Sequence, residues 1–178
     1  MLPEAKAQNL VYYSGQAHSG PSTYVLSLPL GKLVGTLNVS GGLCSDDAGN
    51  VWIAGYPNGS GMQLVEYAHG SQEPIKTLDV PNMSPSACAV DTITGNLAAV
   101  DFGGDGHEVD LYYPGSSYPR IFVDKKLYLD DLTYDSSGNL FVIGFAGSQV
   151  EVAELPKGTT KFEMRRGHIG LNATSGIK

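Results

Sequence analysis

The sequence predicts an all-β protein: a β-propeller made of about four four-stranded antiparallel blades. A phrase that ends in Gly-Asn and an apolar run recurs as "DDAGNVWIAG", "DTITGNLAAV" and "DSSGNLFVIG", starting at Asp46, Asp91 and Asp135 and therefore at steps of 45 and 44 residues. Around each phrase, polar and apolar residues alternate with the period of a half-buried strand. A repeat of this length with four strands is typical of propeller blades.

The elements of one repeat follow a fixed order. The first strand precedes the phrase, as in "GLCSD", and the second follows its Gly-Asn pair, as in "NVWIAGY". The third and fourth strands flank a glycine-centred turn, as in "QLVEYAHGSQEPIKTL". The phrase is therefore the expected turn between the first two strands, since Gly and Asn tolerate positive φ. We expect Asp46, Asp91 and Asp135 to cap this turn by accepting hydrogen bonds from backbone N–H groups; a ligand role is the alternative.

The whole chain, residues 1–178, is expected to form a single domain. The predicted blades occupy about 9–40, 41–80, 86–124 and 130–165, and the first range lacks a first strand. We predict that the tail, 168–178, supplies this strand, because "GHIGLNATSGIK" partly repeats the pattern of blade two. Pairing the two chain ends would close a four-bladed ring and give a monomer. The alternative is part of a larger ring, whose open edge and apolar flank should cause self-association.

The bulk composition excludes some partners. A net charge of -7 argues against nucleic acid, because binding phosphates requires a basic surface. No apolar run approaches the roughly 20 residues that a membrane-spanning helix needs. The first residues, "MLPEAKAQ", lack the basic start and apolar stretch of a signal peptide. The chain is therefore expected to be either cytoplasmic or the mature part of an exported protein.

The two cysteines are predicted to be unpaired. Cys44 and Cys88 are interpreted as equivalent positions on the innermost strands of successive blades. Equivalent positions in neighbouring blades should lie farther apart than the ~7 Å between Cα atoms that a disulfide permits. Two small buried thiols are the resulting prediction.

Candidate ligand-binding residues lie in the loops that connect the fourth strand to the first and the second strand to the third, which share one face of a propeller. The most polar of these loops is "DFGGDGHEVD", 101–110. Adjacent strand residues point to opposite faces, so only one residue of the pair Asp130 and Asp131 is expected to face the channel. Exposed tyrosines beside the loops suit contact with a sugar or a peptide. The candidates are Tyr56, Asn58, Asp105, His107, Tyr128, Asp130 and Asp131.

A metal site is the alternative interpretation of the same loops. No cofactor is expected if these loops are solvated turns. Otherwise Asp105, Glu108 and Asp131 offer the oxygen ligands that Ca²⁺ or another divalent ion prefers. Solvated, glycine-rich turns explain the same residues without a metal.

The chain resembles the NHL-type and related propeller repeats of bacterial secreted proteins. The resemblance is carried by "GLCSDDAGNVWIAG", "VEYAHGSQEPIKTL", "AVDTITGNLAAV" and "YDSSGNLFVIG". It implies a propeller and favours a secreted or periplasmic location. The basic surface of the RNA-binding members is absent here, so the resemblance does not imply RNA binding.

The predicted function is that of a non-enzymatic binding or interaction scaffold for a protein or glycan ligand. No catalytic residue is assigned, because no nucleophile elbow, phosphate-binding loop or dinucleotide fingerprint is present. Two alternatives stay open. One is a metal-dependent hydrolase or lactonase with a divalent ion in the channel, for which Asn58 and Asn82 would add ligands. The other is a truncated propeller without independent function.

Overall fold

The computed structural model describes residues 9–17, 20–57, 61–80, 85–101 and 105–165 and places fifteen strands there in four antiparallel sheets. The first sheet, blade 1, contains β1 (Leu10–Ala17), β2 (Gly20–Ser27) and β3 (Lys32–Leu37). Blade 2 contains β4 (Gly41–Ser45), β5 (Val51–Gly55), β6 (Gln63–Tyr67) and β7 (Pro74–Asp79). Blade 3 contains β8 (Pro85–Val90), β9 (Leu97–Asp101), β10 (Glu108–Tyr112) and β11 (Arg120–Val123). Blade 4 contains β12 (Tyr128–Tyr134), β13 (Leu140–Ala146), β14 (Gln149–Leu155) and β15 (Glu163–Arg165).

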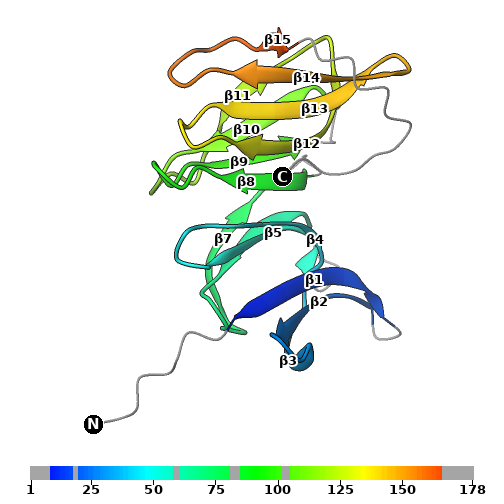
Figure 1. The fold of residues 1–178 in the computed structure, drawn as a ribbon, viewed down its shortest axis with the longest axis vertical. Coiled ribbons are helices and arrows are strands. Elements are labelled where there is room, and N and C mark those ends of the chain that lie inside the picture. Colours follow the sequence, from blue (N-terminus) through cyan, green and yellow to red (C-terminus); the bar gives the residue numbers. More distant parts are fainter. Residues whose placement is uncertain (1–8, 18–19, 58–60, 81–84, 102–104, 166–178) are drawn as a thin grey trace.

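The strands of each blade pair in sequence order. Blades 1 and 2 lie toward one end of the long axis of the molecule, and blades 3 and 4, which overlap in this view, lie toward the other end (Figure 1). The inner strand β8 contacts the inner strands β4 and β12 of the blades on either side. Four-stranded antiparallel blades that pack side by side through their inner strands confirm the predicted propeller fold. No helix among the described residues is long and apolar enough to cross a membrane.

The recurring phrase is a turn held by its own side chains. Asp46 accepts hydrogen bonds from Asn50 through both carboxylate oxygens, from the backbone N–H and from the side-chain amide, each at 2.8 Å. Asp135 accepts the same pair from Asn139 at 2.8 and 2.9 Å. Gly138, which directly precedes Asn139, has a φ of 82°, a backbone conformation that favours glycine. The capping role predicted for these aspartates is confirmed.

The hydrophobic core is divided among the contacts between neighbouring blades. Blades 1 and 2 share a cluster around Val25, Leu37 and Ile53. The blade 2–blade 3 cluster includes Trp52 and Leu64; the third cluster joins blades 3 and 4. The strands β5 and β9 of the inner blades therefore bury both of their faces, one against each neighbouring blade, whereas the outer strands β7 and β11 are largely exposed. Burying one such Leu or Ile side chain contributes about 1.5–3 kcal/mol relative to leaving it exposed.

The described residues form an open row of blades. Blade 1 and blade 4 lie at opposite ends of the long axis (Figure 1). Blade 1 has three described strands, in the order β1-β2-β3. The strand predicted from 168–178 lies outside the described residues.

Candidate binding hollow at the ends of the inner strands

A hollow of about 290 Å³ lies where the inner strands of blades 2, 3 and 4 begin. Its walls come from the first residues of β4 and β8 and from the early part of β12. The lining residues are Gly42, Leu43, Ser86, Ala87, Cys88, Asp130 and Asp131. These positions belong to the face that the sequence predicts for ligands, where the fourth strand of one blade leads into the first strand of the next.

Two β-bulges bring polar side chains to this hollow. In β8 the pairing with β9 shifts between Pro85 and Ala87, so Ser86 is the extra residue. In β12 the pairing with β13 shifts between Leu129 and Asp131, which makes Asp130 the extra residue. A bulge interrupts the alternation of side chains along a strand. Asp130 and Asp131 both line the hollow. The expectation that only one of their side chains faces the channel stays a prediction.

Gly42 lets the inner strands of blades 2 and 3 approach each other closely. A Cβ atom at Gly42 would lie 2.2 Å from the carbonyl oxygen of Ser86 and 2.9 Å from the Cα of Ala87. These are backbone atoms of the neighbouring blade, so they cannot rotate out of the way. Only glycine is compatible with this contact, which forms one wall of the hollow.

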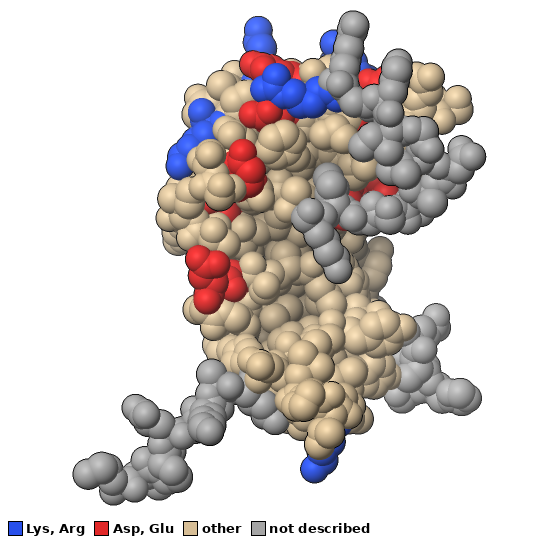
Figure 2. Space-filling view, in the orientation of Figure 1, with Lys and Arg blue, Asp and Glu red and all other residues tan. Residues whose placement is uncertain are grey.

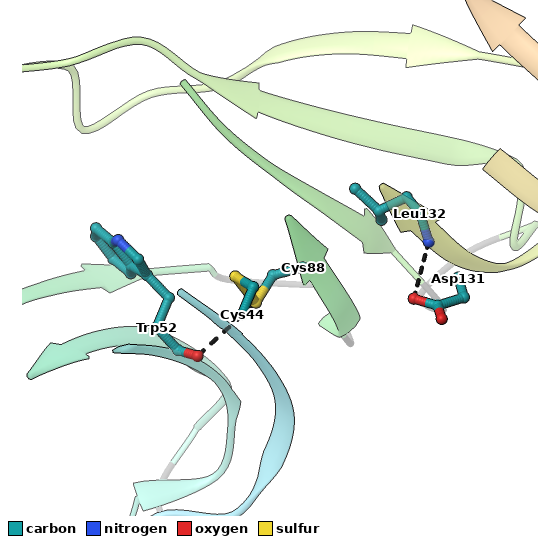
Figure 3. The surroundings of a disulfide bond; sticks show 5 residues. All are labelled: Cys44, Trp52, Cys88, Asp131 and Leu132. Carbon is teal, nitrogen blue, oxygen red and sulfur yellow. Dashed lines mark hydrogen bonds between the residues drawn. A yellow bond between two sulfur atoms is a disulfide. The ribbon is translucent and has the colours of Figure 1, made fainter. Parts of the chain in front are cut away.

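A disulfide joins Cys44 of β4 to Cys88 of β8 beside the hollow, with 5.5 Å between the Cα atoms (Figure 3). The prediction of two separate thiols is therefore wrong. One reason is the close approach at Gly42, two residues before Cys44, which brings the strands nearer than equivalent positions of blades were expected to come. The feature of the sequence that could have indicated this close approach is the Gly-Gly pair that precedes "LCS".

The second reason is that the two cysteines are not equivalent positions. Cys44 pairs with Trp52, two residues after Asn50, whereas Cys88 pairs with Ala99, three residues after Asn96. An offset of one residue turns a side chain to the other face of its strand. Cys44 therefore faces blade 3 and Cys88 faces blade 2, and the two sulfur atoms meet between the blades.

The carboxylates of the hollow supply hydrogen-bond acceptors. Asp131 accepts a hydrogen bond from the backbone N–H of Leu132 at 2.8 Å (Figure 3). Asp130 is half-buried, and Ser86 adjoins it from β8. Ionised carboxylates accept hydrogen bonds only, and together two of them favour a ligand that brings positive charge or several donors.

Two of the other predicted site residues, His107 and Tyr128, form a contact between blades 3 and 4. The Nδ1 atom of His107 contacts the carbonyl oxygen of Leu127, and the rings of His107 and Tyr128 meet edge to face with centroids 6.2 Å apart. Tyr128 also lies against Gly106, where a Cβ atom would be 2.3 Å from its ring. These contacts link the start of β10 to the start of β12 and explain both side chains without a ligand.

The remaining candidates are not brought into a metal site. No group of three or more His, Cys, Asp or Glu side chains in the described part of the chain is placed to hold a metal ion, so Asp105, Glu108 and Asp131 do not form one. Asp105 is exposed, and Tyr56 is exposed just after β5. Asn58 and Asn82 lie outside the described residues.

A buried acidic pair was not predicted from the sequence. Asp110 in β10 is 1% exposed and Asp101 in β9 is 4% exposed. Within the described residues, Oδ2 of Asp110 has no hydrogen-bond partner. Burial, together with the negative charges of Asp101 and Glu108, raises the pKa of Asp110 to about 7. The sequence "EVDLY" could have indicated the buried acid, because alternation along β10 places Asp110 on the same face as Tyr112, which packs between blades 2 and 3.

Comparisons with known proteins support the fold and no particular activity. No protein-family model matches the chain, and no curated protein matches it. Among solved structures it is similar to the hydrazine synthase of Kuenenia stuttgartiensis, with a TM-score of 0.70 and 14% identity over 87% of this chain. The chain spans about half of that protein, 50% of its length. A likeness at this identity shows the shared propeller arrangement alone, so the NHL resemblance stays a prediction.

Proposed function

We propose that the protein is a non-enzymatic propeller scaffold that binds its ligand in the hollow at the ends of β4, β8 and β12. The observation that supports this proposal is the pair of bulges. Each bulge adds a polar residue near the start of an inner strand, Ser86 in β8 and Asp130 in β12. Together with Asp131 these residues line the hollow. Bulges often re-aim side chains beside functional sites.

The ligand class follows from the charges in and around the hollow. Asp130 and Asp131 provide carboxylate oxygens, and none of the described residues that line the hollow is a Lys or an Arg. A carboxylate accepts strong, paired hydrogen bonds from a guanidinium group. The net charge of -7 also attracts a cationic ligand during diffusion. We propose a partner protein that inserts an arginine or lysine side chain between the inner strands.

The metal-dependent hydrolase is the weaker alternative. That class needs several acidic or imidazole ligands that converge from different blades. The described residues contain no such group. No observation on the present structure favours that chemistry over a scaffold.

The disulfide bears on where the scaffold works. Disulfides persist in oxidising compartments and are rare where glutathione keeps thiols reduced. The Cys44–Cys88 bond therefore supports the proposal that the protein is exported, in agreement with the compartment that the NHL resemblance favours.

The binding proposal is tested by NMR titration of the labelled protein with the tripeptide amide acetyl-Gly-Arg-Gly-NH₂. The backbone amides of Gly42, Ser86 and Leu132 are expected to shift in a saturable way, and acetyl-Gly-Glu-Gly-NH₂ is expected to leave them unchanged. Asp130→Asn should abolish the shifts. The matched control Asp47→Asn, which removes the same charge from an exposed turn, should retain them.

Two results would overturn the proposal. Shifts that survive Asp130→Asn would place the peptide elsewhere on the protein. Shifts caused by N-acetylglucosamine but not by the arginine peptide would replace the protein partner with a glycan.

A further inference from the structure

Each inner blade of the row packs through two apolar faces, and the same kind of contact occurs three times. In blade 2, Ile53 and Val65 face blade 1, whereas Ala54 and Leu64 face blade 3. Blades 3 and 4 meet through the same alternation. The structure itself therefore shows what covers a blade face: the opposite face of another blade.

Among the described residues, blade 1 has one such face with no blade against it. Leu10, Tyr12 and Val25 pack toward blade 2, so the alternate residues of the same strands point away from it. Val11 is opposite Leu26, Tyr13 is opposite Tyr24, and Leu26 is opposite Leu33, which places all of them on one face. We call this the first end face; it consists of Val11, Tyr13, Tyr24, Leu26 and Leu33.

The first end face is exposed and uncharged. Val11, Tyr13 and Leu33 are 40%, 60% and 53% exposed. None of its five residues is charged, and the lower end of the molecule, formed by blade 1, is mostly uncharged on the side seen in Figure 2. Exposed apolar surfaces of this kind mark contacts with other proteins.

Blade 4 has the complementary face at the other end of the row. Leu140, Val142 and Ala153 pack toward blade 3. The alternate residues point away, with Ile143 opposite Val152 and Phe145 opposite Val150. We call this the last end face; its apolar residues are Phe141, Ile143, Phe145, Val150 and Val152, and the register also places Glu154, Glu163 and Arg165 on it.

The three charged residues at the outer edge of the last end face are paired with one another. Arg165 forms ion pairs with Glu154 at 2.5 Å and with Glu163 at 3.1 Å. These residues belong to β14 and β15, the outer strands of blade 4. An incoming apolar face would therefore not leave a described ion of this group without its partner.

We propose that the last end face of one copy packs against the first end face of a second copy, and that the reciprocal contact closes an eight-bladed ring of two chains. This contact would be of the same kind as the contacts between successive blades within one chain, where one face of a blade packs against the opposite face of the next. A twofold axis along the channel satisfies both end faces of both copies, and closed twofold dimers are the commonest homo-oligomers. Eight blades lie within the usual range for propellers. The proposal is independent of the ligand proposed for the hollow.

The oligomeric state tests this arrangement by analytical ultracentrifugation over a range of protein concentrations. The wild-type protein should sediment with twice the 18.8 kDa mass of one chain. Tyr13→Lys and Phe145→Lys should each give monomers, because each places a charge on one end face. The control Ile93→Lys changes an exposed apolar residue in a turn, 56% exposed, and should stay dimeric.

Mixing the two variants distinguishes the contact from its alternatives. Tyr13→Lys keeps its last end face and Phe145→Lys keeps its first end face, so an equimolar mixture should recover the dimer mass through one intact contact. A monomeric wild type would overturn the proposal, as would larger open assemblies. A dimer that Tyr13→Lys breaks and Phe145→Lys preserves would show that two first end faces meet instead. Near-ultraviolet circular dichroism confirms folding, and Val150→Lys replaces Phe145→Lys if that half-buried position fails.

Discussion

Gly42 is a residue at which two blades approach each other closely. Gly42→Ala should lower the free energy of unfolding by about 1–3 kcal/mol, the usual cost of inserting a methyl group into a filled space. The cause is specific, because the new Cβ would meet the Ser86 carbonyl group, with its oxygen 2.2 Å and its carbon 2.8 Å away. Urea denaturation followed by fluorescence of Trp52 measures the change.

Gly61 provides the matched control for this substitution. A Cβ atom there would have no heavy atom within 4 Å, so Gly61→Ala should change the free energy of unfolding by less than about 0.5 kcal/mol. Equal effects of the two substitutions would contradict the close contact between β4 and β8.

Asp110 makes the stability of the protein depend on pH. Its folded-state pKa is raised from 3.8 to about 7, so between these values the folded state keeps a proton that the unfolded state has lost. Its contribution to stability is therefore complete below the unfolded pKa, decreases as pH rises toward 7, and levels off above it. Asp110→Asn should reduce the loss of stability between pH 5 and pH 8, because the amide does not ionise.

The relevant quantity is the difference between wild type and variant at each pH, measured by urea denaturation. Asp101 and Glu108, the charged groups that act on Asp110, are present in both proteins and largely cancel in this difference. Parallel pH profiles for the two proteins would show that Asp110 does not titrate in this range.

The disulfide is the covalent link between the inner strands β4 and β8. Replacing both cysteines by serine should lower the free energy of unfolding by roughly 3–4 kcal/mol, because the bond restricts the unfolded chain over a sequence separation of 44 residues. Guanidinium denaturation of the double variant against the oxidised wild type measures the loss. A change below 1 kcal/mol would mean that the packing between blades 2 and 3 alone holds these strands.

The strands were predictable from the sequence because their signal is local. The alternation of polar and apolar residues indicates which side chains share a face. The phrase from Asp to Gly-Asn marks the turn, where Asn139 donates two hydrogen bonds to Asp135 within a stretch of five residues. The disulfide depends on contacts between blades. An offset of one residue in the pairing of Cys88 and a missing side chain at Gly42 decide it, and neither follows from the period of the repeat.

The candidate site was predictable in part for the same reason. The sequence indicated the face of the propeller and the residues Asp130 and Asp131, which line the hollow. It did not reveal the bulge at Asp130, because strand register depends on the partner strand. His107 and Tyr128 were selected as polar or aromatic loop residues, yet they contact each other and the backbone of Leu127.

At the scale of the whole molecule, the row stabilises itself only through contacts between neighbours. Within the part of the chain that the structure describes, blades 2 and 3 are covered on both faces, whereas blades 1 and 4 are each covered on one. Repeat architectures of this kind require their terminal units to be capped, because an uncapped unit leaves apolar surface in water. The two end faces are therefore where the free energy of the fold depends most on what lies outside the chain.

This dependence predicts that thermal stability rises with protein concentration. If two copies cap each other, a tenfold higher concentration favours the folded dimer by about 1.4 kcal/mol, and the Tm should rise by a few degrees. Tyr13→Lys should have a Tm that is lower and independent of concentration, whereas Ile93→Lys should behave as the wild type does. Differential scanning calorimetry at several concentrations measures these shifts. A wild-type Tm that does not change with concentration would mean that the end faces are stable in water, and that a single chain keeps its four blades without a second copy.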